Sequence, residues 1–115
     1  MSILIAMAFP VLPGKEQELR AFTDELNHGK KEAYVNARKQ MGIHERAFLQ
    51  KTPMGELVIV TMEGDQPDNL LSRGIQPNDE FSKWFLERVK SIHGVDLSHP
   101  PSADAMAQLI VDSEA

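Results

Sequence analysis

The fold of this chain is decided by residues 43–64, which read IHERAFLQKTPMGELVIVTMEG. Two runs rich in β-branched and aromatic residues flank a short segment in which Pro53 and Gly55 suit the first central and the last position of a type I turn. The pattern predicts a β-hairpin in which Lys51 lies directly opposite Glu56.

Four further elements are predicted around this hairpin. Residues 2–9 are apolar and are followed by prolines, which favours a buried first strand over a signal peptide. Apolar side chains of residues 15–41 repeat at helical spacing, and Gly29 is expected to kink or break this helix because glycine disfavours helix interiors. A short helix over residues 65–74 and an aromatic-rich helix over residues 79–93 follow, and the second is expected to anchor the core.

The end of the chain allows two interpretations. Residues 95–102 are expected to be extended, because the residue before a proline avoids the helical region and two prolines follow His99. Residues 107–112 combine an apolar Leu-Ile-Val run, which favours a strand, with preceding alanines, which favour a helix. If residues 103–115 contain a strand, it could join its own sheet or that of a partner subunit.

The predicted order of elements is β-α-β-β-α-β, so we expect one α+β domain over residues 1–115 with the ferredoxin-like plan and an antiparallel sheet. The first strand and most of residues 57–62 are apolar on both faces, but the helices of this plan cover only one face. A second copy of the chain is the simplest cover for the other face. We therefore expect a homodimer that packs sheet against sheet.

Composition excludes several classes of protein. A formal net charge of −5 over 115 residues argues against nucleic-acid binding, and the densest basic run, Lys30-Lys31 with Arg38-Lys39, is interpreted as a solvated helix face. The chain has no cysteine, so disulfides, thiolate metal sites and cysteine nucleophiles are excluded. No stretch reaches the roughly 20 apolar residues that a membrane helix requires, and a cytoplasmic location is expected.

Three segments carry a resemblance to a known family. The junction FPVLPGK at residues 9–15, the hairpin end MEGD at residues 62–65 and the helix that leads from Trp84-Phe85 to HGVD at residues 93–96 resemble the dimeric α/β-barrel superfamily. The chain is most similar to small antibiotic-biosynthesis-monooxygenase-like proteins, and the likeness covers most of its length. It implies a ferredoxin-like dimeric barrel. Because cofactor-free monooxygenases, isomerases and haem-handling enzymes share this fold, the resemblance implies no single reaction and no catalytic residue is carried over.

The predicted register places eight side chains on one face of the hairpin: His44, Arg46, Phe48, Gln50, Leu57, Ile59, Thr61 and Glu63. One end of this face is ionisable and the other is apolar. A pocket of this kind could bind an organic acid or a phenol, with His44 as proton acceptor and Arg46 paired with an anion. The alternative is a salt bridge and cross-strand pair at the rim of the sheet with no further role.

Glu45 falls on the opposite, otherwise apolar face, beside Ala47, Leu49, Val58, Val60 and Met62. A carboxylate in such surroundings is a candidate acid or base, because desolvation favours its protonated form. The alternatives are that Glu45 reaches solvent at the strand end or pairs with a cation across a subunit interface.

His93, Asp96 and His99 are metal-ligand residue types at three-residue intervals. A histidine at a helix C-terminus and an aspartate that caps a turn are the preferred explanation of these residues, so no metal is expected. Trp84 and Tyr34 could pack in the core or an interface, or line a pocket.

The sequence thus predicts a protein that binds a small apolar organic molecule between sheet and helices, with cofactor-free monooxygenase or isomerase-type chemistry as the possible activity. The candidate catalytic residues are His44, Glu45, Arg46 and Glu63, and the candidate ligand-binding residues are Phe48, Thr61, Trp84 and Tyr34. No cofactor is expected, since phosphate-loop, dinucleotide-binding, serine-elbow and zinc-helix motifs are all missing. The alternative is a non-enzymatic dimeric accessory or sensing module whose polar cluster is structural.

Overall fold

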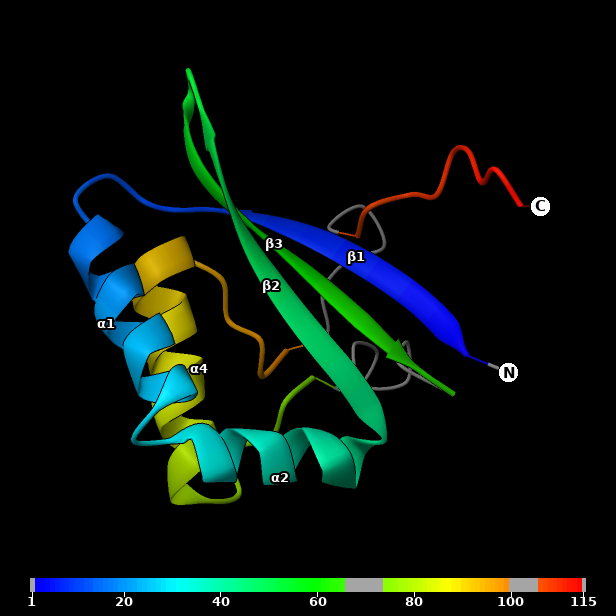
Figure 1. Cartoon of the computed structure of the whole chain (residues 1–115). Coiled ribbons are helices and arrows are strands. Elements are labelled where there is room, and N and C mark those ends of the chain that lie inside the picture. Colours follow the sequence, from blue (N-terminus) through cyan, green and yellow to red (C-terminus); the bar gives the residue numbers. More distant parts are fainter. Residues whose placement is uncertain (1, 66–73, 100–105, 115) are drawn as a thin grey trace.

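The computed structural model describes residues 2–65, 74–99 and 106–114 and has an α+β fold (Figure 1). One antiparallel sheet of three strands, in the order β1-β3-β2, is formed by β1 (Ile3–Pro10), β2 (Ile43–Thr52) and β3 (Gly55–Gly64). Helices α1 (Glu16–Asn27) and α2 (Lys31–Met41) connect β1 to β2, and α4 (Glu80–His93) follows β3.

The β2-β3 hairpin has the predicted register. Lys51 lies opposite Glu56, and Thr52 lies opposite Gly55 across the turn. The Thr52 hydroxyl supports this turn because it donates to the carbonyl of Gly55 at 2.7 Å and accepts from the amide of Met54 at 3.2 Å. The alternation of faces predicted for both strands is therefore confirmed.

The predicted helix break is also confirmed, because α1 ends at Asn27 and α2 begins at Lys31. Gly42 ends α2 in the left-handed conformation with φ 71°, which glycine adopts without the steric cost that other residues meet. Since β2 starts at the next residue, this single glycine turns the chain from the helix into the sheet.

The core lies between the helices and one face of the sheet. Leu19 and Phe22 of α1 pack against three buried residues of α4, namely Phe85, Val89 and Ile92. A second buried cluster, formed by Met7, Ile43 and Met62, lies on the sheet. The aromatic-rich helix is thus a main contributor to the core, as its sequence predicts.

The other face of the sheet is left open by the described residues. The side chains of Leu4 and Phe48 on this face are 63% and 54% exposed, although both are large and apolar. Residues that point to the opposite face of the sheet, such as Met7 of β1 and Met62 of β3, are buried under the helices. The sheet is therefore covered on one side only.

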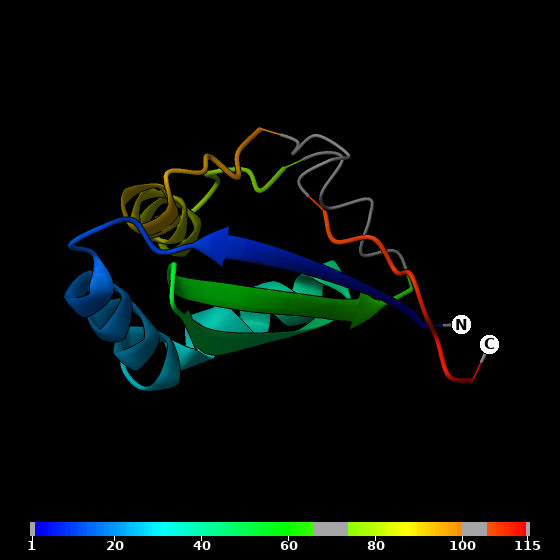
Figure 2. The same cartoon turned by 90° about the horizontal axis from the view of Figure 1, so that it is seen from above.

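The predicted final strand is not formed, so the fold is not the full β-α-β-β-α-β plan. Residues 106–114 contain neither strand nor helix, and their backbone makes one hydrogen bond to β1, from the Ala107 amide to the Ala6 carbonyl at 3.0 Å. Figures 1 and 2 show this tail beside β1 before it runs past the edge of the sheet. The apolar residues 109–111 are exposed there, so pairing them would gain little burial to offset the loss of backbone entropy.

Two further predictions concern a short helix and membrane-spanning segments. The short helix predicted for residues 65–74 lies almost wholly outside the described residues. None of the helices in the described ranges combines the length and the apolar character needed to cross a bilayer.

Candidate functional site

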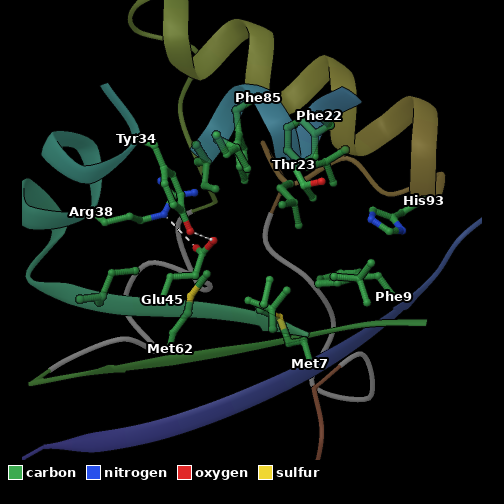
Figure 3. Close-up of a pocket in the computed structure, with 18 of the residues that line it drawn as sticks. Met7, Phe9, Phe22, Thr23, Tyr34, Arg38, Glu45, Met62, Phe85 and His93 are labelled. Atoms are coloured by element: carbon green, nitrogen blue, oxygen red, sulfur yellow. Dashed lines mark hydrogen bonds and ion pairs between the residues drawn. The ribbon is translucent and has the colours of Figure 1, made fainter. Parts of the chain in front are cut away.

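A mostly apolar cavity of about 100 Å³ lies between the sheet and the helices (Figure 3). Met7 and Phe9 of β1 and Met62 of β3 form part of its floor, and Phe22 of α1 and Phe85 of α4 line the opposite wall. The alternation of β-strand side chains explains the floor, because every second residue of each strand points toward the helices. The cavity thus occupies the middle of the core.

A cluster of three polar side chains, Tyr34, Arg38 and Glu45, lies at one end of this cavity. Tyr34 and Arg38 come from the same face of α2, since residues four apart on a helix are neighbours. The Tyr34 hydroxyl donates to Glu45 Oε2 at 2.6 Å, and Arg38 Nε donates to Glu45 Oε1 at 2.8 Å. Both carboxylate oxygens of Glu45 are therefore engaged.

The Arg38–Glu45 ion pair is almost completely removed from solvent. The two side chains are 6% and 7% exposed. The guanidinium carbon lies 5.0 Å from the centre of the Tyr34 ring and 4.8 Å from the centre of the Phe85 ring. Such stacking on aromatic faces, together with the ion pair, is a means of holding a buried arginine in place.

The hydrogen bonds of Arg38 involve two of its three side-chain nitrogens among the described residues. Nε donates to Glu45 and Nη1 donates to the sulfur of Met41 at 3.8 Å. Nη2 is buried and has no hydrogen-bond partner in the part of the chain that the structure describes. Buried donors are nearly always satisfied in proteins, so an unpartnered donor on a residue that lines the cavity is a candidate hydrogen-bond donor to a ligand.

Burial raises the pKa of Tyr34, and the adjacent carboxylate of Glu45 raises it further through repulsion and the hydrogen bond. The tyrosine is therefore neutral at physiological pH and serves as a donor. Arg38 and Glu45 carry opposite charges, so the three residues together contribute no net charge to the cavity.

His93, the last residue of α4, also lines the cavity, away from the ion pair (Figure 3). Its Nδ1 lies 2.8 Å from the Pro10 carbonyl oxygen, and because a carbonyl only accepts, Nδ1 carries the proton. Burial lowers the pKa of His93, although the hydrogen bond to Pro10 opposes this effect. The imidazole is thus neutral, and Nε2 is left as a proton acceptor.

The predicted catalytic residues are divided between the two faces of the sheet. Glu45 lies in the cavity, whereas His44, Arg46 and Glu63 lie on the open face. The side chains of Arg46 and Glu63 are 47% and 40% exposed there and form an ion pair at 3.5 Å. This matches the alternative of a rim salt bridge.

The predicted ligand-binding residues are divided in the same way. Tyr34 lines the cavity, while Phe48 and Thr61 belong to the open face. Trp84 packs against the core beside Phe22 and has the ammonium group of Lys30 at 4.9 Å from its ring. It is not among the described residues that line the cavity.

The three metal-ligand candidates have other partners. His93 is bonded to Pro10, and Asp96 accepts hydrogen bonds from the amide and hydroxyl of Ser98 in a turn. Nε2 of His99 lies 3.6 Å from Oδ2 of Asp96. In residues 2–65, 74–99 and 106–114, no group of three metal-ligating side chains is arranged to hold an ion.

Sequence reasoning missed Arg38 as a site residue. Its interpretation as part of a solvated helix face is wrong, because the side chain is buried against Glu45. A usable signal was present, because Tyr34, Arg38 and Met41 are spaced four and three residues apart. This spacing places Arg38 on the same helix face as Tyr34 and the apolar Met41. For His93, which sequence reasoning considered only as a metal ligand or a helix C-terminal residue, the position one residue after the buried Ile92 gave no hint of a cavity.

Comparisons of the chain with protein-family models, with curated proteins and with solved structures find no match. The resemblance to the dimeric α/β-barrel superfamily therefore stays a prediction. Function has to be inferred from the cavity and from the side chains that line it.

Proposed function

We propose that the protein binds a small, mostly apolar organic molecule in the cavity between the sheet and the helices. The observation that carries this proposal is the cavity itself, an apolar space of about 100 Å³ with polar groups confined to a few places on its wall. Ligand sites in proteins typically have this composition. A dry cavity of roughly 150 Å³ takes up benzene, so a space of about 100 Å³ limits the ligand to the size of a single ring or a short branched chain.

The buried polar cluster supports binding over a purely structural role. A structural ion pair is expected to satisfy its own hydrogen bonds, because an unsatisfied buried donor costs about 1–3 kcal/mol. Arg38 leaves Nη2 without a partner among the described residues, even though Tyr34 and Glu45 hold the rest of the cluster. A ligand with one polar group would meet that need.

An isomerase-type proton transfer is the second candidate, and His93 is the observation that favours it. A neutral imidazole whose Nδ1–H is fixed by a backbone carbonyl presents Nε2 as a base. A binding or sensing module needs the cavity but not this base, so His93→Asn separates the two. Loss of turnover with retained ligand affinity would support the enzyme, whereas unchanged turnover would remove His93 from the chemistry.

We also propose that a second copy of the chain covers the open face, which would give the ferredoxin-like dimeric barrel. The order β1-β3-β2 with helices on one face supports this, because it corresponds to three of the four strands of that plan. Leu4 and Phe48 would lose their exposed apolar surface in such a dimer. Native mass spectrometry of the purified protein would count the subunits and reveal any retained ligand.

Uptake of ethylbenzene tests the proposed binding site. We expect saturable binding to the wild-type protein and its loss in Val60→Phe, because Val60 lines the cavity and a phenyl ring would fill much of it. Ile59→Phe is the matched control, since the neighbouring residue points to the open face of the same strand. Equal binding by both variants would place the probe outside the cavity, and no binding by the wild-type protein would contradict the proposal.

A further inference from the structure

We infer that the ligand presents an uncharged carbonyl oxygen, as in a ketone, ester or amide, to Nη2 of Arg38. This inference rests on the proposed function and specifies the chemical class of the molecule that the cavity takes. It depends on two features of the described residues, the unused donor and the charge balance of the cavity wall.

The first feature is the donor inventory of Arg38. A guanidinium has five N–H groups on three nitrogens. Two of those nitrogens have partners, Nε on Glu45 and Nη1 on Met41, while the buried Nη2 has none among the described residues. A partner for Nη2 has to be a hydrogen-bond acceptor, and a carbonyl oxygen accepts without bringing a donor that would itself need a buried partner.

The second feature is charge. The ionisable side chains among the described residues that line the cavity are Tyr34, Arg38, Glu45 and His93. Raised and lowered pKa values keep Tyr34 and His93 neutral, and the charges of Arg38 and Glu45 cancel each other. A carboxylate would therefore bring an unpaired negative charge into an apolar space, beside the carboxylate of Glu45. A carbonyl oxygen accepts from the same nitrogen and adds no charge.

The fixed position of the guanidinium makes this recognition selective. Arg38 is held by the ion pair with Glu45, and its guanidinium carbon lies 5.0 Å and 4.8 Å from the ring centres of Tyr34 and Phe85. A donor that is already ordered loses little freedom when the ligand arrives, so more of the interaction energy appears as affinity. The carbonyl oxygen would consequently be bound in one orientation, with the apolar body of the ligand among Phe22, Phe85 and the sheet.

Acetophenone labelled with ¹³C at its carbonyl carbon tests the inference. Hydrogen bonding moves this resonance downfield from its position in cyclohexane, so the shift of the bound probe reports the contact directly. We expect a downfield shift on the wild-type protein. In Arg38→Lys, which keeps a positive charge beside Glu45 but has no Nη2, the shift should return toward the cyclohexane value and the affinity should fall about tenfold.

Two comparisons make the result specific. Arg20→Lys makes the same change at an exposed residue of α1 and should leave shift and affinity as in the wild-type protein. Benzoate, a charged molecule of similar size, should bind the wild-type protein at least tenfold more weakly than acetophenone.

Three results would overturn the inference. These are a bound carbonyl with its cyclohexane shift, binding of benzoate as tight as that of acetophenone, and an Arg38→Lys variant that is folded and unaffected. If ethylbenzene still binds in any of these cases, the apolar site stands and only its carbonyl preference is lost. If neither acetophenone nor ethylbenzene binds, the proposed function fails as well. Should Arg38→Lys not fold, the wild-type shift and the benzoate comparison decide.

Discussion

Glu45 is a carboxylate buried in a strand, and its hydrogen bonds explain how the fold tolerates it. Tyr34 and Arg38 each donate to one of its oxygens, and Arg38 supplies the opposite charge. Breaking such a pair costs far more than the pair contributes, because the remaining charge is left buried without compensation. The stability of the molecule should therefore depend strongly on these few atoms.

The first prediction concerns this ion pair. We expect Glu45→Gln to lower the free energy of unfolding by roughly 3 kcal/mol, because the charge of Arg38 loses its counterion. Urea denaturation followed by circular dichroism would measure the change. The double variant Glu45→Leu with Arg38→Met removes both charges and should recover most of the loss. A single variant as stable as the wild-type protein would show that the pair is not buried in solution.

A second prediction at the scale of one residue concerns the pH dependence set by His93. Burial lowers its pKa below the ordinary value of 6.5 in the folded protein, so near that pH the unfolded chain binds more protons than the folded one. Stability should therefore rise with pH through this range and fall as the pH drops below 6.5.

Urea denaturation of the wild-type protein and of His93→Asn between about pH 5 and pH 8 would measure this dependence. The variant keeps a side-chain N–H for the Pro10 carbonyl but cannot titrate, so its stability should vary less with pH. The other three histidines are present in both proteins, so the difference isolates His93. Parallel curves would exclude His93 as the titrating group.

At the scale of elements, α1 and α4 are joined by a polar clamp as well as by their apolar faces. Glu18 of α1 accepts from Arg88 at 2.9 Å, from Ser91 at 2.9 Å and from Lys15 at 3.3 Å. Burial would raise the pKa of Glu18, but the hydrogen bonds and positive charges outweigh it and the pKa is lowered. The ionised form of Glu18 thus stabilises the pairing of the helices.

The third prediction follows from this clamp. Glu18→Gln should lower the free energy of unfolding by about 1 kcal/mol at neutral pH. The pKa of Glu18 is lower in the folded protein than the value of 4.5 in the unfolded chain, so the ionised carboxylate stabilises the fold at every pH above 4.5. This contribution is lost as the pH falls through the pKa of the folded state. The stabilities of the two proteins should therefore converge in acid. Glu25→Gln, at an exposed position of the same helix, is the control and should have little effect. A constant difference at every pH would contradict the role of the charge.

The elements that could be predicted are those specified by neighbouring residues. Pro53 and Gly55 marked the hairpin turn, Gly29 marked the helix break, and the aromatic spacing of residues 79–93 marked α4. The tail was not predictable, because Leu109-Ile110-Val111 has strand character but pairs only where a covered surface rewards it. The local pattern of residues was sufficient to predict an element where the residues that specify it lie close together in the sequence.

The site was predictable in part for the same reason. Alternation along β2 placed Glu45 on the apolar face, and the structure bears out that position. The position of its partner Arg38 depends on how α2 packs against the sheet, and no pattern of neighbouring residues indicates this packing. The two residues are only seven apart, but Gly42 reverses the chain between them and brings helix and strand together.

For the whole molecule, the open face of the sheet leads to the fourth prediction. If a second copy covers this face, Phe48→Glu should weaken the dimer at least tenfold, because it would bury a charge in the interface. Leu49→Glu is the control, since Leu49 is similarly exposed but points to the other face of the same strand. Sedimentation velocity across a range of concentrations would measure both, and a wild-type monomer would contradict the proposed assembly.

The buried pair of Arg38 and Glu45 also has a consequence for how the chain finds its fold. A slip of β2 by one residue would exchange the two faces of the strand and bring His44 or Arg46 under the helices in place of Glu45. Neither side chain could satisfy Arg38 and Tyr34, so the misaligned hairpin would leave buried charges without partners. The pair therefore acts against misalignment: one carboxylate discriminates between the native pairing of the strands and its nearest competitors.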